Sequence, residues 1–129
     1  ERIEPEELEE LNRLLLEITK ASASGSMEKI VKLDTAFHDV LYKASRNDRL
    51  RNIINNLREQ ITGIRGTSMR YPGRLADTIE EHRALVDSIA ARDSEKAQAA
   101  ARIHLENAEH TLLKAMAEEQ QVQEGHDNN

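Results

Sequence analysis

Cysteine and tryptophan are absent from this chain of 129 residues, and its only aromatic residues are two Tyr and one Phe. Without cysteine the chain has no disulfide, no thiolate metal site and no thiol nucleophile. So few aromatic residues exclude most all-β folds, which depend on aromatic and β-branched side chains. Only two prolines and five glycines interrupt the sequence, which predicts long helices with few breaks. No apolar run approaches the roughly 18 residues of a membrane span, and we expect no membrane contact.

Charged residues are plentiful but unevenly placed. The 24 acidic and 18 basic residues give a net charge of −6, which makes the chain by itself a poor candidate for nucleic-acid binding. Six glutamates lie within residues 1–10, and seven arginines lie within residues 46–74. Such runs are usually solvated helix faces, but the arginines also suggest contact with an anion. The sequence starts at Glu1 without an apolar signal region, which favours a cytoplasmic fragment of a longer protein.

Apolar residues recur at helical spacing in five stretches, and short polar segments separate them. A third helix is expected to start at the N-cap Asn47 and to end between Gly63 and the 71–73 turn, and Asp93 is the expected N-cap of the last. The other four helices are predicted over about 5–21, 26–45, 74–92 and 97–120. Because the connections are short, we predict an all-α antiparallel helical bundle of five to six helices. The domain is expected over residues 1–122, followed by a polar, frayed tail over 123–129.

Four polar residues interrupt the apolar stripes of three predicted helices. Asp34 and His38 are four residues apart and share one helix face. His82 and His104 occupy inward positions of the two last helices. An ionised Asp inside an apolar bundle is costly unless a partner compensates it, and one divalent cation would compensate it while using all three imidazoles. The alternative interpretation is that the histidines are core residues with ordinary hydrogen-bond partners.

One carboxylate and three imidazoles suit Zn, Ni, Mn, Fe or Co, and we expect one divalent transition metal, with zinc preferred. Four protein ligands would leave two positions open on a six-coordinate ion, whereas tetrahedral zinc would leave none. The residue spacing does not choose between these geometries.

The predicted third helix carries an apolar stripe and two arginines on one flank. The stripe residues expected to face the core are Leu50, Ile54, Leu57, Ile61 and Ile64. Arg58 and Arg65 lie beside them and are candidates to hold a carboxylate ligand next to a metal. The alternative is that their stems pack on the bundle while their head groups stay in water.

Other polar residues near these positions receive weaker expectations. Arg70 and Arg74 belong to the loop around Tyr71 and are expected to be exposed. Asn107 lies three residues after His104, so it is either a hydrogen-bond donor behind that histidine or, as we favour, a helix-surface amide. His110 lies off the inward face and is expected at the surface.

The segment Asp34-Thr35-Ala36-Phe37-His38, followed by Asn47-Asp48-Arg49-Leu50, resembles the D-x-x-F-H and N-x-x-L signature of the FCD domain. Further matching blocks, within a resemblance over residues 8–115, are Arg65 to His82, which includes Tyr71-Pro72-Gly73-Arg74, then Arg92-Asp93, Ala97 and His104-Leu105. FCD domains are the C-terminal effector-binding domains of GntR-type bacterial transcription regulators of the FadR subfamily.

This resemblance implies a helical bundle in which Asp34, His38, His82 and His104 hold a metal. It also implies that Arg65 lies near a small organic-acid effector, a carboxylate metabolite bound beside the metal; Arg58 and Asn107 are further candidates. Members of the family act as homodimers and bind operator DNA through an N-terminal winged helix-turn-helix domain. We expect residues 1–129 to lack both that domain and the usual first FCD helix.

The resulting hypothesis is a ligand-sensing domain and not an enzyme. A metal-dependent hydrolase or oxygenase is the first alternative, but no clear general base lies beside the ligands, because Glu81 points about 100° around the helix from His82. A metal-free dimerisation module with core histidines is the second. Metal content separates this module from the other two hypotheses, and turnover separates the enzyme from the sensor.

Overall fold

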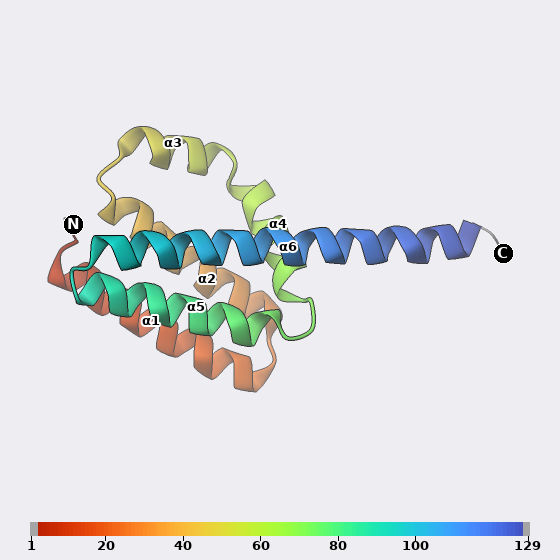
Figure 1. The fold of residues 1–129 in the computed structure, drawn as a ribbon, viewed down its shortest axis with the longest axis horizontal. Coiled ribbons are helices and arrows are strands. Elements are labelled where there is room, and N and C mark those ends of the chain that lie inside the picture. The colour runs from red at the N-terminus through yellow and green to blue at the C-terminus, as the bar shows by residue number, and fades with distance from the viewer. Residues whose placement is uncertain (1–2, 128–129) are drawn as a thin grey trace.

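The computed structural model describes the backbone of residues 3–127 and the side chains of residues 3–121. Within that range its elements of regular secondary structure are all helices, which confirms the predicted all-α bundle (Figure 1). The helices are α1 (Pro5–Ser24), α2 (Met27–Ala44), α3 (Asp48–Asn56), α4 (Arg58–Met69), α5 (Arg74–Ala90) and α6 (Ser94–Asp127). No helix in the described part of the chain is long and apolar enough to cross a membrane.

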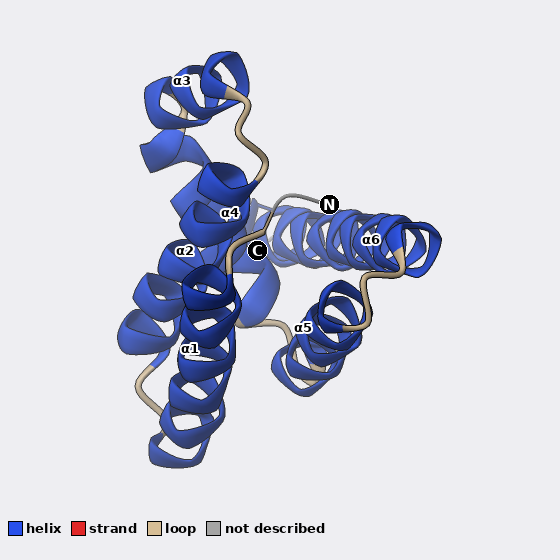
Figure 2. Cartoon of the chain, turned by 90° about the vertical axis from the view of Figure 1, so that its left-hand side faces the viewer, coloured by secondary structure: helices blue, strands red, loops and turns tan. Residues whose placement is uncertain are grey.

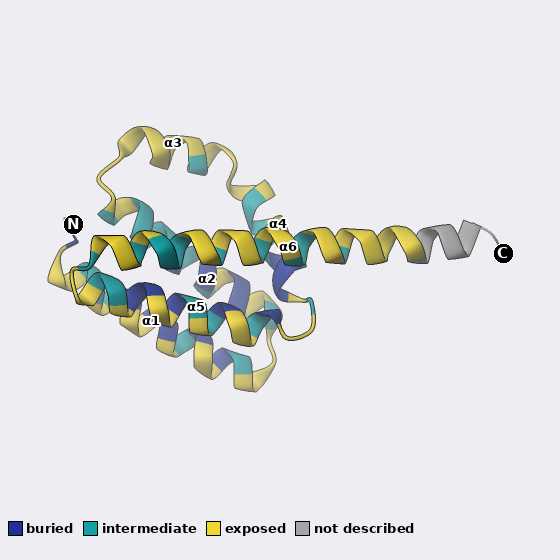
Figure 3. Ribbon diagram, in the orientation of Figure 1, coloured by how far each residue is buried: buried dark blue, intermediate teal, exposed yellow. Residues whose placement is uncertain are grey.

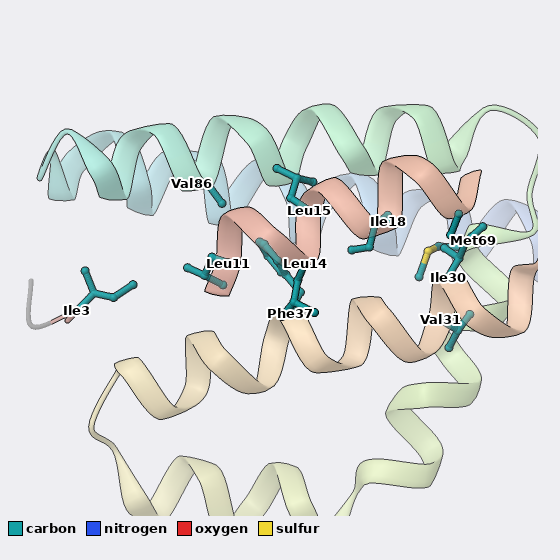
Figure 4. Close-up of a cluster of buried hydrophobic side chains, with 11 residues drawn as sticks. Ile3, Leu11, Leu14, Leu15, Ile18, Ile30, Val31, Phe37, Met69 and Val86 are labelled. Carbon is teal, nitrogen blue, oxygen red and sulfur yellow. The ribbon is translucent and has the colours of Figure 1, made fainter. Parts of the chain in front are cut away.

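The hydrophobic core lies where α1, α2 and α5 meet (Figure 4). Its largest fully buried side chains come from all three helices: Leu11, Leu15 and Ile18 from α1, Ile30 and Phe37 from α2, and Val86 from α5. Within α1, Leu11, Leu15 and Ile18 follow a four- and three-residue spacing, which places them on one face. Helix α6 lies along α5 and extends past the other helices (Figure 1). Figure 2 shows α3 and the start of α4 set apart from the other helices.

Residues at four helix ends explain why those helices start or stop there. Pro5 occupies the first turn of α1, where its missing N–H costs nothing. Gly25 ends that helix with a left-handed φ of 80°, which glycine adopts without strain. Asn47 accepts a hydrogen bond from the Leu50 N–H (2.9 Å), and Asp93 accepts one from the Lys96 N–H (3.1 Å). Both predicted caps are therefore confirmed.

The prediction of one continuous third helix is wrong. The helix is interrupted at Leu57 (φ −107°, ψ 12°), so that two helices, α3 and α4, form in its place. The predicted stripe does not face the core either, because α3 has no buried residue (Figure 3). Leu50, Leu57 and Ile64 are 36%, 46% and 50% exposed. The apolar spacing shows that each helix is amphipathic, but the turn at Leu57 directs the two apolar faces away from a common core.

Helix α6 is longer than predicted at both ends. It begins at Ser94, directly after its cap, and its backbone continues to Asp127 instead of ending near residue 120. Residues 123–127 of the expected polar tail therefore have a helical backbone, while residues 128–129 lie outside the described part.

Neighbouring leucines on α1 test this core. Leu15 is fully buried and Leu16 is 52% exposed. We expect Leu15→Ala to lower the free energy of unfolding by about 2–5 kcal/mol, because it removes buried apolar volume. The control Leu16→Ala should change it by less than about 0.5 kcal/mol. Urea unfolding followed by circular dichroism measures both, and equal losses would contradict this core.

Candidate functional site

The four predicted ligands come together between three helices. Asp34 and His38 lie one turn apart on α2, His82 lies on α5 and His104 on α6. Each histidine offers a ring nitrogen, and these three nitrogens lie within 4.8 Å of one another. The Asp34 carboxylate reaches two of the rings, with Oδ2 3.5 Å from His38 Nε2 and Oδ1 3.4 Å from His82 Nε2.

The centre of this cluster is buried and incompletely hydrogen-bonded. His82 is fully buried, and its ring stacks on Phe37 with 4.3 Å between centroids and 11° between planes. Neither His82 nitrogen has a hydrogen-bond partner among the described residues, and Asp34 Oδ1 has none either. Each buried polar atom without a partner costs about 1–3 kcal/mol. Such atoms facing one another indicate a missing common partner.

The protonation states suit binding of a cation. Burial lowers the pKa of His82 to about 3, against the attraction of Asp34. Burial also lowers the pKa of His104, against its bond to Glu81. Burial raises the pKa of Asp34, but His38, His82 and Arg65 outweigh it and bring that pKa to about 2. At neutral pH the centre therefore presents two uncharged imidazoles with free lone pairs beside an ionised carboxylate.

This donor set fits a metal ion. Two donors on opposite sides of an ion with bonds of about 2.1 Å are about 4.2 Å apart, close to the 4.8 Å within which the three nitrogens lie. Neutral imidazoles and a carboxylate are the forms that metals bind, and a bound ion would satisfy Asp34 Oδ1 and one of the two unpartnered His82 nitrogens.

Glu81 is part of this site although the sequence reasoning set it aside. His104 Nδ1 lies 2.7 Å from Glu81 Oε1, and the Asn107 amide donates to Glu81 Oε2 (2.9 Å). Burial raises the pKa of Glu81, but hydrogen bonds from Arg74, Asn107 and His104 outweigh it and lower the pKa. Glu81 is therefore ionised, so the His104 proton sits on Nδ1 and leaves the Nε2 lone pair free.

Arg74 is buried, so the prediction that it is exposed is wrong. Its side chain is only 4% exposed, and its guanidinium holds both oxygens of Glu81, at 2.8 and 2.6 Å. The two residues lie seven apart, which places them two turns apart on the same face of α5. This spacing could have predicted the Arg74–Glu81 pair from the sequence. Glu81 points away from His82, as expected, but α6 with His104 lies on that side.

A cavity of about 470 Å³ opens beside the cluster, between α2, α4, α5 and α6. Asp34, His38 and His104 line it, and so does Arg65. Arg65 donates to the Tyr42 hydroxyl (3.0 Å), and its Nε lies 3.8 Å from Asp34 Oδ2. The structure therefore brings Arg65 to the predicted ligands.

The two other predicted effector residues lie elsewhere. The Arg58 guanidinium pairs with Asp39, with bonds of 3.0 and 3.1 Å, and faces a separate pocket between α2 and α3. Asn107 is exposed and does not line the cavity by Arg65, but it holds Glu81 in place behind His104. His110 is at the surface, as expected.

Breaking the Arg74–Glu81 pair tests its importance for the fold. We expect Arg74→Met to lower the free energy of unfolding by about 3 kcal/mol, because it leaves a nearly buried carboxylate without its bidentate partner. The value lies at the lower end for such pairs because Glu81 keeps Asn107 and His104. The control Arg70→Met removes an exposed guanidinium in the same segment. Similar values for the two variants in chemical unfolding would contradict the pair's structural role.

Comparison with known proteins agrees with the resemblance seen in the sequence. The family model of the FCD domain matches residues 1–107, which is most of the chain and includes the four clustered residues and Arg65. No curated protein matches the chain. The FCD domain is the C-terminal effector-binding domain of GntR-family transcription regulators. This chain belongs to the FCD domain family.

Proposed function

We propose that this effector-binding domain holds one divalent transition metal on Asp34, His38, His82 and His104, and binds a small carboxylate effector beside it. The observation that carries the proposal is the set of buried, unpartnered atoms of His82 and Asp34 within the histidine cluster. In a metal-free dimerisation module, the burial of these polar atoms would cost free energy that no interaction compensates.

Zinc is the metal we expect, with nickel, manganese or iron as alternatives. Residues other than the four proposed ligands would also help to hold such an ion. Glu81 fixes the tautomer of His104, and Arg74 and Asn107 fix Glu81. A carboxylate behind a ligating histidine orients the ring and strengthens it as a donor.

The charge balance of the site favours an anionic effector. Asp34 and Glu81 carry two negative charges, and Arg65 and Arg74 carry two positive charges. Since His82 and His104 are neutral, a divalent ion would leave an excess of positive charge beside the cavity. A carboxylate could meet both the Arg65 guanidinium and an open position on the ion.

An enzymatic role receives no support from the residues around the cluster. Glu81 is the nearest candidate base, but Arg74, Asn107 and His104 occupy both its oxygens. A general base needs a lone pair free to take a proton from a substrate or water. We therefore place this site in ligand sensing.

In the complete regulator, effector binding would alter operator binding through its differential affinity for two arrangements of the domains. We propose that the regulator is a homodimer whose winged-helix domains contact the DNA.

Metal content tests the ligand set directly. We expect about one divalent ion per chain in the purified protein and loss of this ion in His82→Ala, because His82 lies at the centre of the cluster. The control His110→Ala removes an exposed imidazole on α6 and should keep the ion. Plasma mass spectrometry measures both. Absence of metal from wild type, with no thermal shift on adding Zn, Ni or Mn, would overturn the metal site.

The two arginines suggested by the sequence provide a matched test of effector binding. We expect Arg65→Gln to weaken carboxylate binding by about tenfold or more, since it removes a charged hydrogen-bond donor. Arg58→Gln should leave binding unchanged, because Arg58 faces Asp39 and a different pocket. Titration calorimetry of metal-loaded protein with acetate, butanoate, succinate and malate measures this. Equal behaviour of the variants would contradict the position proposed for the effector.

A further inference from the structure

The cavity beside the histidine cluster has two chemically different parts. One part is polar: Arg65 Nε lies 3.8 Å from Asp34 Oδ2, and the other polar side chains of the lining include Arg74, Ser68 and Thr78. Most of the exposed lining surface is nevertheless apolar. The apolar lining residues include Ile61 and Ile64 on α4, and Leu105, Ala108 and Leu112 on α6.

The apolar part extends the cavity away from the proposed ligands. Ala108 and Leu112 lie four and eight residues after His104, so they continue its face of α6 for one and two turns. Leu112 is about 12 Å along the helix axis from His104. On α4, Ile61 lies one turn before Arg65. Apolar lining residues thus continue past the charged groups along both α4 and α6.

Some of these walls are exposed to solvent. Ile64 is 50% exposed and Leu105 is 68% exposed. Apolar surface that borders a cavity gains stability when a ligand removes it from water. The cavity volume of about 470 Å³ lies within the range of small-molecule sites.

We propose that the effector is a monocarboxylate with an unbranched apolar tail of several carbons. The carboxylate lies by Arg65 and the metal, and the tail lies between α4 and α6 along Ile64 and Leu105. This inference rests on the proposed function and specifies the chemical class of its ligand.

A second carboxylate on the effector is disfavoured. Outside the polar end, the charged residue lining the cavity is Glu109, one turn beyond Leu105 on α6. This acid would repel an anionic group placed at the far end, whereas a hydrocarbon tail places no charge near it. A dicarboxylate would also leave its second carboxylate unpaired against apolar walls.

A chain-length series tests the proposal. Metal-loaded protein is titrated calorimetrically with acetate, butanoate, hexanoate and octanoate, and with succinate and malate for comparison. We expect affinity to rise by up to about fourfold for each CH₂ that becomes buried, and to level off once the tail reaches solvent. Hexan-1-ol, which has the tail without the charge, should not bind measurably.

Two exposed leucines on α6 provide matched variants. Leu105 lines the cavity, whereas Leu113 is 58% exposed and does not. Leu105→Ser should weaken octanoate binding by about fivefold or more and leave acetate binding within twofold. Leu113→Ser should change neither.

The outcomes separate this inference from the proposed function. Equal affinities along the series, tighter binding of succinate or malate, or identical effects of the two leucine variants would overturn the apolar-tail proposal while carboxylate sensing stands. Failure of metal-loaded protein to bind any carboxylate would overturn both. Tight binding of hexan-1-ol would show a plain apolar surface, such as one covered by another protein segment, and would also overturn the inference.

Discussion

The burial of one carboxylate, that of Asp34, is the constraint on which the rest of the site depends. Its side chain is only 4% exposed, and a carboxylate in that environment needs compensating charge or hydrogen bonds. Imidazoles from α2 and α5 and the Arg65 guanidinium from α4 approach it, while Oδ1 still has no hydrogen-bond partner. Asp34 therefore joins helices that are distant in sequence, and the proposed metal and effector would complete this junction.

Periodicity identified the four clustered residues because they break an apolar pattern. Asp34, His82 and His104 fall at positions where a leucine or isoleucine would continue the stripe, and His38 follows Asp34 by one turn. A polar group at such a position must find a partner inside the fold, so the pattern itself indicates a shared site. The helix caps Asn47 and Asp93 were predictable for a similar reason, since each satisfies backbone donors within a few residues.

Features that depend on the packing partner were not predictable from local pattern. The stripe through Leu57 is helical on both sides, and only the break there separates α3 from α4. Arg74 follows the Pro72-Gly73 turn and so looked like a loop residue, but it begins α5 and is buried against Glu81. Adjacent residues on a helix point in different directions, so Glu81 appeared remote from His82. It became part of the site because α6 covers that side.

Helix α4 contributes differently from the other helices of the site, and this difference bears on signalling. Its buried residues, Gly66, Ser68 and Met69, lie near its C-terminal end, and the preceding α3 has none. Little apolar burial therefore fixes the segment that precedes Arg65. An effector held between Arg65 and a metal on α2, α5 and α6 would add contacts that α4 otherwise lacks. Since a ligand shifts an equilibrium only by its differential contacts, α4 is the element whose position such a ligand would bias most.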